Sequence, residues 1–166
     1  MPLRYIAMPD DEAERLQQGG SDAYGNPPER RVSDGDGVPC RHCLRNVDAG
    51  EAYLILAYRP FASAQAYAET GPIFMHADKC PAHDERSLPA ILTSSKDYLL
   101  RGYDADERIV YGTGGIVSAE GLVERAVALL ARPDVTFVHV RSAKYNCYQC
   151  RIEADREEPG ADKRRA

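Results

Sequence analysis

Two Cys-x-x-Cys pairs constrain the fold of this 166-residue chain more than any other feature. The first pair is Cys40 and Cys43, and the second pair is Cys147 and Cys150. In a flat strand, residues three apart point to opposite faces of the sheet. Neither pair can therefore bring its two sulfurs together unless the chain turns there, and we expect a tight turn at each pair.

The size of the chain does not explain its cysteines. A chain of 166 residues can bury a full hydrophobic core, so it needs no covalent or metal cross-link to compensate for small size. This length predicts one domain. The formal net charge of −5 argues against a nucleic-acid partner and against binding to an anionic membrane.

The location of the protein follows from what its N-terminus and its apolar runs lack. The first ten residues do not form a signal peptide, and no apolar run approaches the length of a membrane span. A cytoplasmic protein is therefore predicted. In that reducing compartment, paired cysteines are more often metal ligands or redox groups than disulfides, and five cysteines cannot all pair within one chain.

Hydrophobic periodicity predicts an α+β fold, with a largely antiparallel sheet and two helices in a single domain over residues 1–153. One helix is expected between Pro9 and Gly19–Gly20, and another between the capping residue Ser118 and Pro133. Strands are predicted at residues 3–7, 52–58, 72–76, 98–103, 108–111, 135–141 and 150–153. Residues 19–38 are predicted to form a long loop, and residues 154–166 a disordered charged tail.

Six short motifs occur in a characteristic order: Val38 to Arg45, Asp48 to Glu51, Gly71 to Phe74, Tyr103 to Asp106, Val138 to Arg141 and Cys147 to Arg151. Together they resemble the bacterial family catalogued as domain of unknown function 1203. The resemblance extends from about Leu3 to Glu153. It implies a single domain of an uncharacterised family, and it brings no activity, substrate or catalytic residue.

The cysteines predict a zinc site, because zinc is usually held by four tetrahedral nitrogen and sulfur ligands. The simplest site uses both pairs and would clip the N-terminal loop to the last strand; its ligands are Cys40, Cys43, Cys147 and Cys150. A variant site arises if residues 52–58 and 72–76 form a hairpin, which returns the chain toward Cys43. Its ligands are Cys40, Cys43, Cys80 and either His76 or His83. Buried thiols that only pack, and a redox dithiol, remain alternatives.

Three functions stay open at this point. The first is a zinc-stabilised binding or interaction module with an unknown protein or small-molecule partner, and the second is a metal- or thiol-dependent enzyme. The third is a nucleic-acid-binding module that uses the basic and aromatic residues Arg141, Lys144, Tyr145, Tyr148 and Arg151. His139 and Arg141 share one strand face, which is either a polar pocket, an anion site or, the expectation we favour, a solvated face. The sequence does not determine the oligomeric state.

Overall fold

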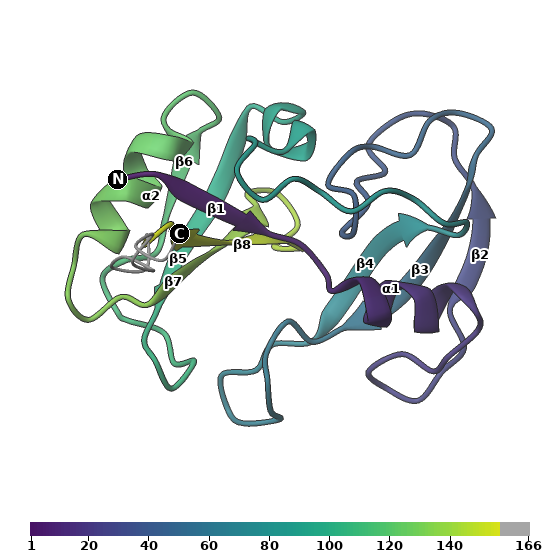
Figure 1. The fold of residues 1–166 in the computed structure, drawn as a ribbon, viewed down its shortest axis with the longest axis horizontal. Helices are drawn as coiled ribbons and strands as arrows, with labels where there is room; N and C mark the ends of the chain where they lie inside the picture. The colour runs from purple at the N-terminus through teal and green to yellow at the C-terminus, as the bar shows by residue number, and fades with distance from the viewer. Residues whose placement is uncertain (157–166) are drawn as a thin grey trace, which may run out of the picture.

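The computed structural model describes residues 1–156, which form two antiparallel sheets with one helix beside each (Figure 1). This arrangement confirms the predicted α+β class. The strands are β1 (Leu3–Ile6), β2 (Glu29–Val32), β3 (Ala52–Tyr58), β4 (Gly71–His76), β5 (Asp97–Tyr103), β6 (Gly115–Ser118), β7 (Phe137–Ser142) and β8 (Tyr148–Ala154). The helices are α1 (Asp10–Gln17), α2 (Leu122–Leu130) and the short 3-10 helix η1 (Ala90–Thr93).

The larger sheet has the strand order β1-β8-β7-β5-β6 and packs against α2. This helix forms because its apolar residues recur every three or four positions and so occupy one face. The buried members of that face are Leu122, Ala126, Leu129 and Leu130. They join inward-pointing residues of the sheet, among them Val138, Val140 and Ile152, in one continuous core.

The smaller sheet has the order β2-β3-β4 and lies beside α1 (Figure 1). Strands β3 and β4 pair antiparallel from Tyr53↔His76 to Tyr58↔Gly71, which confirms the predicted hairpin. Their buried residues, including Leu54, Leu56, Ile73 and Met75, form a second core with Ala13 and Leu16 of α1. The sequence predicted one sheet, and the structure has two sheets with a large core each, besides a small third cluster of Phe61, Tyr103 and Phe137.

Two strands differ from the prediction. Strand β2 lies inside the predicted loop 19–38, and all four of its residues are exposed, so no apolar alternation marks it. The partner of β5 is β6 rather than residues 108–111, which contribute only the isolated bridge Tyr103↔Ile109. Ser118 ends β6 and accepts hydrogen bonds from the backbone N–H of Gly121, the residue that precedes α2.

The predicted tail is only partly described. Ala154 is the last residue of β8, and residues 157–166 lie outside the described part of the chain. Within residues 1–156, no helix has the length and apolar content that a membrane crossing requires.

Candidate metal centre

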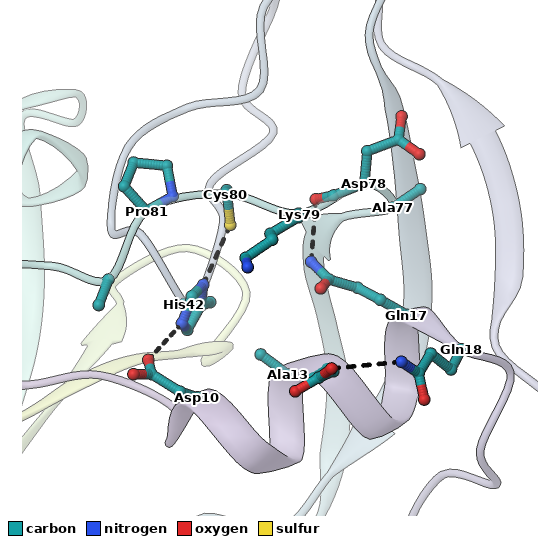
Figure 2. Close-up of a pocket in the computed structure, with 12 residues that line it drawn as sticks. Asp10, Ala13, Gln17, Gln18, His42, Ala77, Asp78, Lys79, Cys80 and Pro81 are labelled. Carbon is teal, nitrogen blue, oxygen red and sulfur yellow. Dashed lines mark hydrogen bonds and ion pairs between the residues drawn. The ribbon is translucent and has the colours of Figure 1, made fainter.

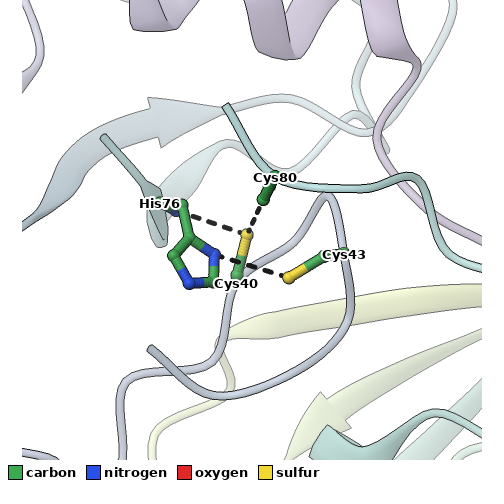
Figure 3. A group of neighbouring side chains, drawn as sticks. All are labelled: Cys40, Cys43, His76 and Cys80. Atoms are coloured by element: carbon green, nitrogen blue, oxygen red, sulfur yellow. Dashed lines mark hydrogen bonds between the residues drawn. The ribbon is translucent and has the colours of Figure 1, made fainter. Parts of the chain in front are cut away.

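The first Cys pair lies in a closed turn. The Cys40 N–H donates to the Arg45 carbonyl at 2.9 Å, and the Leu44 N–H donates to the Cys40 carbonyl at 3.0 Å. Leu44 adopts a left-handed φ of 55°, which reverses the chain direction directly after Cys43. The turn predicted at this pair is therefore confirmed, and both sulfurs point to the same side (Figure 3).

The β3–β4 hairpin brings two further ligands to this turn. His76 is the last residue of β4, and Cys80 follows it by four residues. The turn is attached to the same strand, because Cys40 bridges Phe74 and the Arg41 N–H donates to the Phe74 carbonyl at 3.2 Å. As a result, one potential ligand atom from each of four side chains lies within 4.8 Å of the others (Figure 3); the residues are Cys40, Cys43, His76 and Cys80.

The spacing of these atoms fits a tetrahedral zinc ion. The Cys40 and Cys80 sulfurs are 3.9 Å apart, and the Cys43 sulfur is 3.4 Å from Nδ1 of His76. Zn–S bonds of about 2.3 Å and Zn–N bonds of about 2.0–2.1 Å imply tetrahedral edges of about 3.8 Å between two sulfurs and about 3.5 Å between sulfur and nitrogen. Three sulfurs and one imidazole nitrogen are also a donor set that zinc prefers.

The ionisation of the three thiols favours a cation among them. Contacts with Cys43, Cys80 and His76 lower the pKa of Cys40. The Cys40 sulfur in turn raises the pKa values of Cys43 and Cys80. One thiolate therefore forms readily, whereas the next two are opposed by the charge already present. A divalent cation would remove this opposition, because metal binding stabilises all the deprotonated ligands together.

Two hydrogen bonds, one from outside the group and one within it, hold His76 in place. Nε2 of His76 lies 3.3 Å from a carboxylate oxygen of Glu51, and the backbone N–H of His76 donates to the Cys40 sulfur at 3.3 Å. A carboxylate on the second ring nitrogen is the usual support of a metal-binding histidine, since it sets the tautomer and the ring orientation. Nδ1 of His76 would then be free to face a bound metal ion.

A second histidine–carboxylate pair, His42 with Asp10, supports Cys80. Nδ1 of His42 lies 3.0 Å from the Cys80 sulfur, and Nε2 of His42 lies 2.7 Å from Oδ1 of Asp10 (Figure 2). Asp10 is the first residue of α1, so these two contacts connect the helix to the cluster. The only sequence signal for these groups is the position of His42 inside the first Cys pair. Asp10 and Glu51 lie far from the cysteines in sequence and carry no signal.

A cavity of about 490 Å³ lies beside Cys80. Its lining includes Asp10, His42, Lys79 and Cys80, and Figure 2 shows the last three grouped around the space. Gln17 of α1 closes one side, where its amide donates to the carbonyls of His76 and Asp78 at 3.0 Å each. The sulfur of Cys80 therefore faces both the cluster and the cavity.

The second Cys pair does not join the first. Cys150 lies in β8 with its side chain in the core of the larger sheet, where burial raises its pKa to about 12. Cys147 lies before the strand, and its sulfur contacts the Tyr145 carbonyl at 3.8 Å. In the described part of the chain, neither belongs to a group of three or more potential ligands. All five thiols are free, and His83 contacts the Ser87 carbonyl instead of a cysteine.

The two Cys pairs behave differently because the chain reverses direction at a different position in each. The positive φ after the first pair closes a turn that contains both cysteines, whereas the positive φ of Asn146 (60°) comes before Cys147. Cys147 therefore ends the β7–β8 turn and Cys150 continues into the strand, so their sulfurs diverge. The simplest predicted site, with two cysteines from each pair, is not assembled; the variant that uses Cys80 and His76 is the one brought together.

The link predicted between the N-terminal loop and the last strand exists, but an arginine makes it. Arg41 is 2% exposed, and its Nε donates to the Tyr148 carbonyl of β8 at 2.7 Å. Its Nη1 donates to the Pro39 carbonyl at 2.6 Å. Burial lowers the pKa of Arg41 to about 10, which still leaves the side chain charged at neutral pH.

The basic and aromatic residues near the C-terminus divide between the interior and the surface. Arg141 and Tyr148 are buried, whereas Tyr145 is 73% exposed. The five residues are therefore not all available on the surface. His139 is also buried, so the favoured expectation of a solvated face for His139 and Arg141 is wrong. Their strand is covered because residues around Phe61 pack onto it.

Comparison with known proteins identifies a family but no activity. Residues 37–154 match the model of the family described as "Protein of unknown function (DUF1203)". The match includes all four members of the Cys3His cluster and leaves out Asp10. No curated protein and no solved structure matches the chain. Because the match covers more than half of its length, the chain belongs to this family of unknown function.

Proposed function

We propose that the protein is a binding or interaction module whose smaller sheet is stabilised by a structural zinc ion. The proposed ligands are Cys40, Cys43, His76 and Cys80. The observation that carries the proposal is the convergence of three sulfurs and one nitrogen at tetrahedral spacing from three separate chain segments. Four protein ligands leave no open coordination position, which is typical of structural rather than catalytic zinc.

Zinc would serve this part of the molecule because its hydrophobic core is interrupted by the potential ligands themselves. Three of the thirteen buried members of that core are cysteines of the cluster, so part of its interior consists of potential ligands rather than large apolar groups. An ion held there would join the turn at Cys40, the end of β4 and the segment at Cys80. Its binding energy would add to the stability of the fold, since the ligands come together only in the folded state.

We keep the cytoplasm as the proposed location. Five unpaired thiols, four of them buried, are in keeping with a reducing compartment. The partner of the module is proposed to be a protein or a small molecule, and an anionic small molecule is argued separately below.

The test is the metal content of four variants. Protein purified without chelators or a His tag is expected to carry one zinc ion in native mass spectrometry. Cys43→Ser and Cys80→Ser should lose the ion, whereas Cys147→Ser and Cys150→Ser, the matched controls, should retain it. Metal-free protein with an unchanged melting temperature in chelator would contradict the proposal.

A second candidate is an enzyme that uses Cys80 as a nucleophile. The observation that favours it is the chain Cys80–His42–Asp10 at the edge of the 490 Å³ cavity. A thiol, a base within hydrogen-bond reach and a carboxylate that orients the base are the parts of an activated nucleophile. We rank this function second, because it removes Cys80 from the four-ligand site.

Alkylation separates the two candidates. If Cys80 is a structural ligand, iodoacetamide should label it slowly in the zinc-loaded protein and rapidly after chelation. If Cys80 is a nucleophile activated by His42, the folded protein should be labelled rapidly at that residue without chelation. In that case, His42→Ala should slow the labelling, and peptide mass spectrometry would report the site.

A further inference from the structure

The larger sheet carries a second group of polar side chains, on the face opposite its core. Val138 and Val140 of β7 point into the core, so the alternate residues His139 and Arg141 point the other way. The pairings Arg101↔His139 and His139↔Arg151 place two more arginines beside them, on β5 and β8. Three guanidinium groups and one imidazole thus come from adjacent positions of three neighbouring strands.

Arg141 is the member whose charge is least satisfied. It is 4% exposed, and its Nη1 donates to the Asn146 carbonyl at 3.0 Å. Its Nη2 lies 3.2 Å from a Glu69 carboxylate oxygen, which is close enough for an ion pair but not aligned as a hydrogen bond. Its buried Nε has no acceptor among residues 1–156.

The nearest carboxylate is shared. Oε1 of Glu69 accepts a hydrogen bond from Arg101 at 2.9 Å, while Oε2 faces Arg141. One negative charge thus serves two guanidinium groups, and a net positive charge remains between the two sheets. His139 does not change this balance, because burial and the nearby Arg141 lower its pKa well below the ordinary value and keep it neutral.

A cavity of about 290 Å³ lies against this arginine. One wall comes from the smaller sheet, with Tyr58, Pro72 and Ile73, and the other comes from the larger sheet, with Arg141 and Tyr148. This size is near the lower end of the roughly 300–1,000 Å³ of small-molecule sites. The walls are mostly apolar, as is usual for such sites, and they carry two charged groups, Arg141 and the Glu69 carboxylate that it shares with Arg101.

We propose that this cavity binds a small organic anion, whose carboxylate or phosphate oxygens pair with Arg141 and whose apolar part lies against Tyr58 and Tyr148. A buried guanidinium that shares its carboxylate with a second arginine is under-compensated, and an oxyanion in the cavity supplies further negative charge. The planar fork of arginine matches two oxygens of a carboxylate or phosphate group. The site is separate from the metal centre, so the proposal does not depend on zinc.

The first test uses benzoate and phenyl phosphate as probes, with benzyl alcohol as the neutral control. Each is titrated into the full-length protein while the Nε–Hε resonance of Arg141 is followed by NMR. At least one anion should shift this resonance saturably, and benzyl alcohol should not; the stronger anion identifies the preferred headgroup. No shift up to roughly 10 mM of either anion, or equal binding of the alcohol, would overturn the proposal.

Charge variants provide the second test. Glu69→Gln removes the competing carboxylate and should tighten anion binding by about three- to fivefold. Arg141→Lys keeps the charge but loses the fork, and should weaken binding by about tenfold. Arg132→Lys, an exposed arginine paired with Asp134, is the control and should bind like the wild type. Weaker binding by Glu69→Gln would contradict the proposal, and this variant leaves the buried arginine in place, so its result stands even if Arg141→Lys does not fold.

Discussion

The two sheets of this protein use cysteine in opposite ways. In the larger sheet, Cys150 is one of sixteen buried residues of a continuous core and contributes as a small apolar group. In the smaller sheet, three of thirteen buried residues are cysteines, and their sulfurs converge with His76. The same residue type thus packs as a small apolar group in one core, and serves as a potential ligand in the other, where three sulfurs and an imidazole converge.

The two Cys pairs also differ in how the backbone turns beside them. Both have the same spacing, and both lie next to a residue with positive φ. Only the first pair lies wholly inside its turn. Spacing therefore makes a shared ligand site possible, and the position of the chain reversal decides whether it forms.

Metal removal should produce the largest difference in stability between the two sheets. We expect chelation to lower the free energy of unfolding of the smaller sheet by at least about 4 kcal/mol, because structural zinc contributes about 10–16 kcal/mol in zinc-finger peptides. Hydrogen exchange should show amides of β3 and β4 losing protection while those of β7 and β8 keep it. Equal loss in both sheets would mean that the two cores do not unfold independently. In Cys43→Ser, which should already lack the ion, chelator should have no further effect.

Loss of Arg41, which connects the Cys40 turn to β8, should have the next largest effect. Arg41→Met removes the donors for the Tyr148 and Pro39 carbonyls and should cost about 2–4 kcal/mol in urea unfolding. The zinc content should not change, since Arg41 contacts no ligand sulfur through its side chain. Arg45→Met, on an exposed residue of the same turn, should cost less than about 0.5 kcal/mol. Similar costs for the two variants would show that the buried link is unimportant.

Substituting the side chains that hold the metal ligands in place should have a smaller effect, and this effect should be confined to the smaller sheet. We expect His42→Ala and Asp10→Asn to weaken zinc binding by about 10- to 100-fold, as loss of a group that orients a ligand does in other zinc sites. Competition with a chromophoric chelator would measure this. His83→Ala is the matched control, because its side chain bonds to the Ser87 carbonyl and is not a member of the metal cluster. Unchanged affinity in His42→Ala would indicate that Cys80 needs no support.

The smallest effect should be a loss of stability at acidic pH, caused by His139 of the larger sheet. Burial, with Arg141 and Arg151 nearby, lowers the pKa of His139 well below 6.5. As the pH falls below about 6.5, the unfolded chain takes up a proton that the folded protein does not, so stability falls by about 1.4 kcal/mol per pH unit. His139→Leu should lack this component, and its stability should fall less steeply between about pH 7 and about pH 5.5.

The difference between the two proteins isolates His139, because the metal ligands titrate in both. Urea unfolding at a series of pH values measures it. Parallel curves for the wild type and His139→Leu would show that this histidine is not held in its neutral form.

Much of the fold could be predicted because its elements carry local patterns. The apolar run at Ala52–Tyr58 predicted β3, and the acidic start after Pro9 predicted α1. Strand β2 carried no such pattern, since an exposed edge strand has no buried face to mark it. Strand β6 begins at Gly115, in a glycine-rich segment typical of turns, and its strand conformation comes from pairing with β5.

The candidate site was predicted only in its parts. The sequence shows which side chains can bind a metal and that Cys40 and Cys43 need a turn. The choice of His76 and Cys80 over the second pair depends on the β3–β4 hairpin and on the Cys40–Phe74 bridge. Such pairings join residues that are far apart in sequence, and hydrophobic periodicity does not report them.

By itself, then, the sequence determined the α+β class, the ligand types and the need for a turn at Cys40, because each follows from local propensity and spacing. The tertiary structure alone decided which cysteines meet, that Arg41 rather than a metal joins the loop to β8, and that Arg141 and His139 are buried. The physical reason is that burial and convergence depend on long-range packing, where one strand pairing or one positive φ redirects a side chain from a shared site into a core.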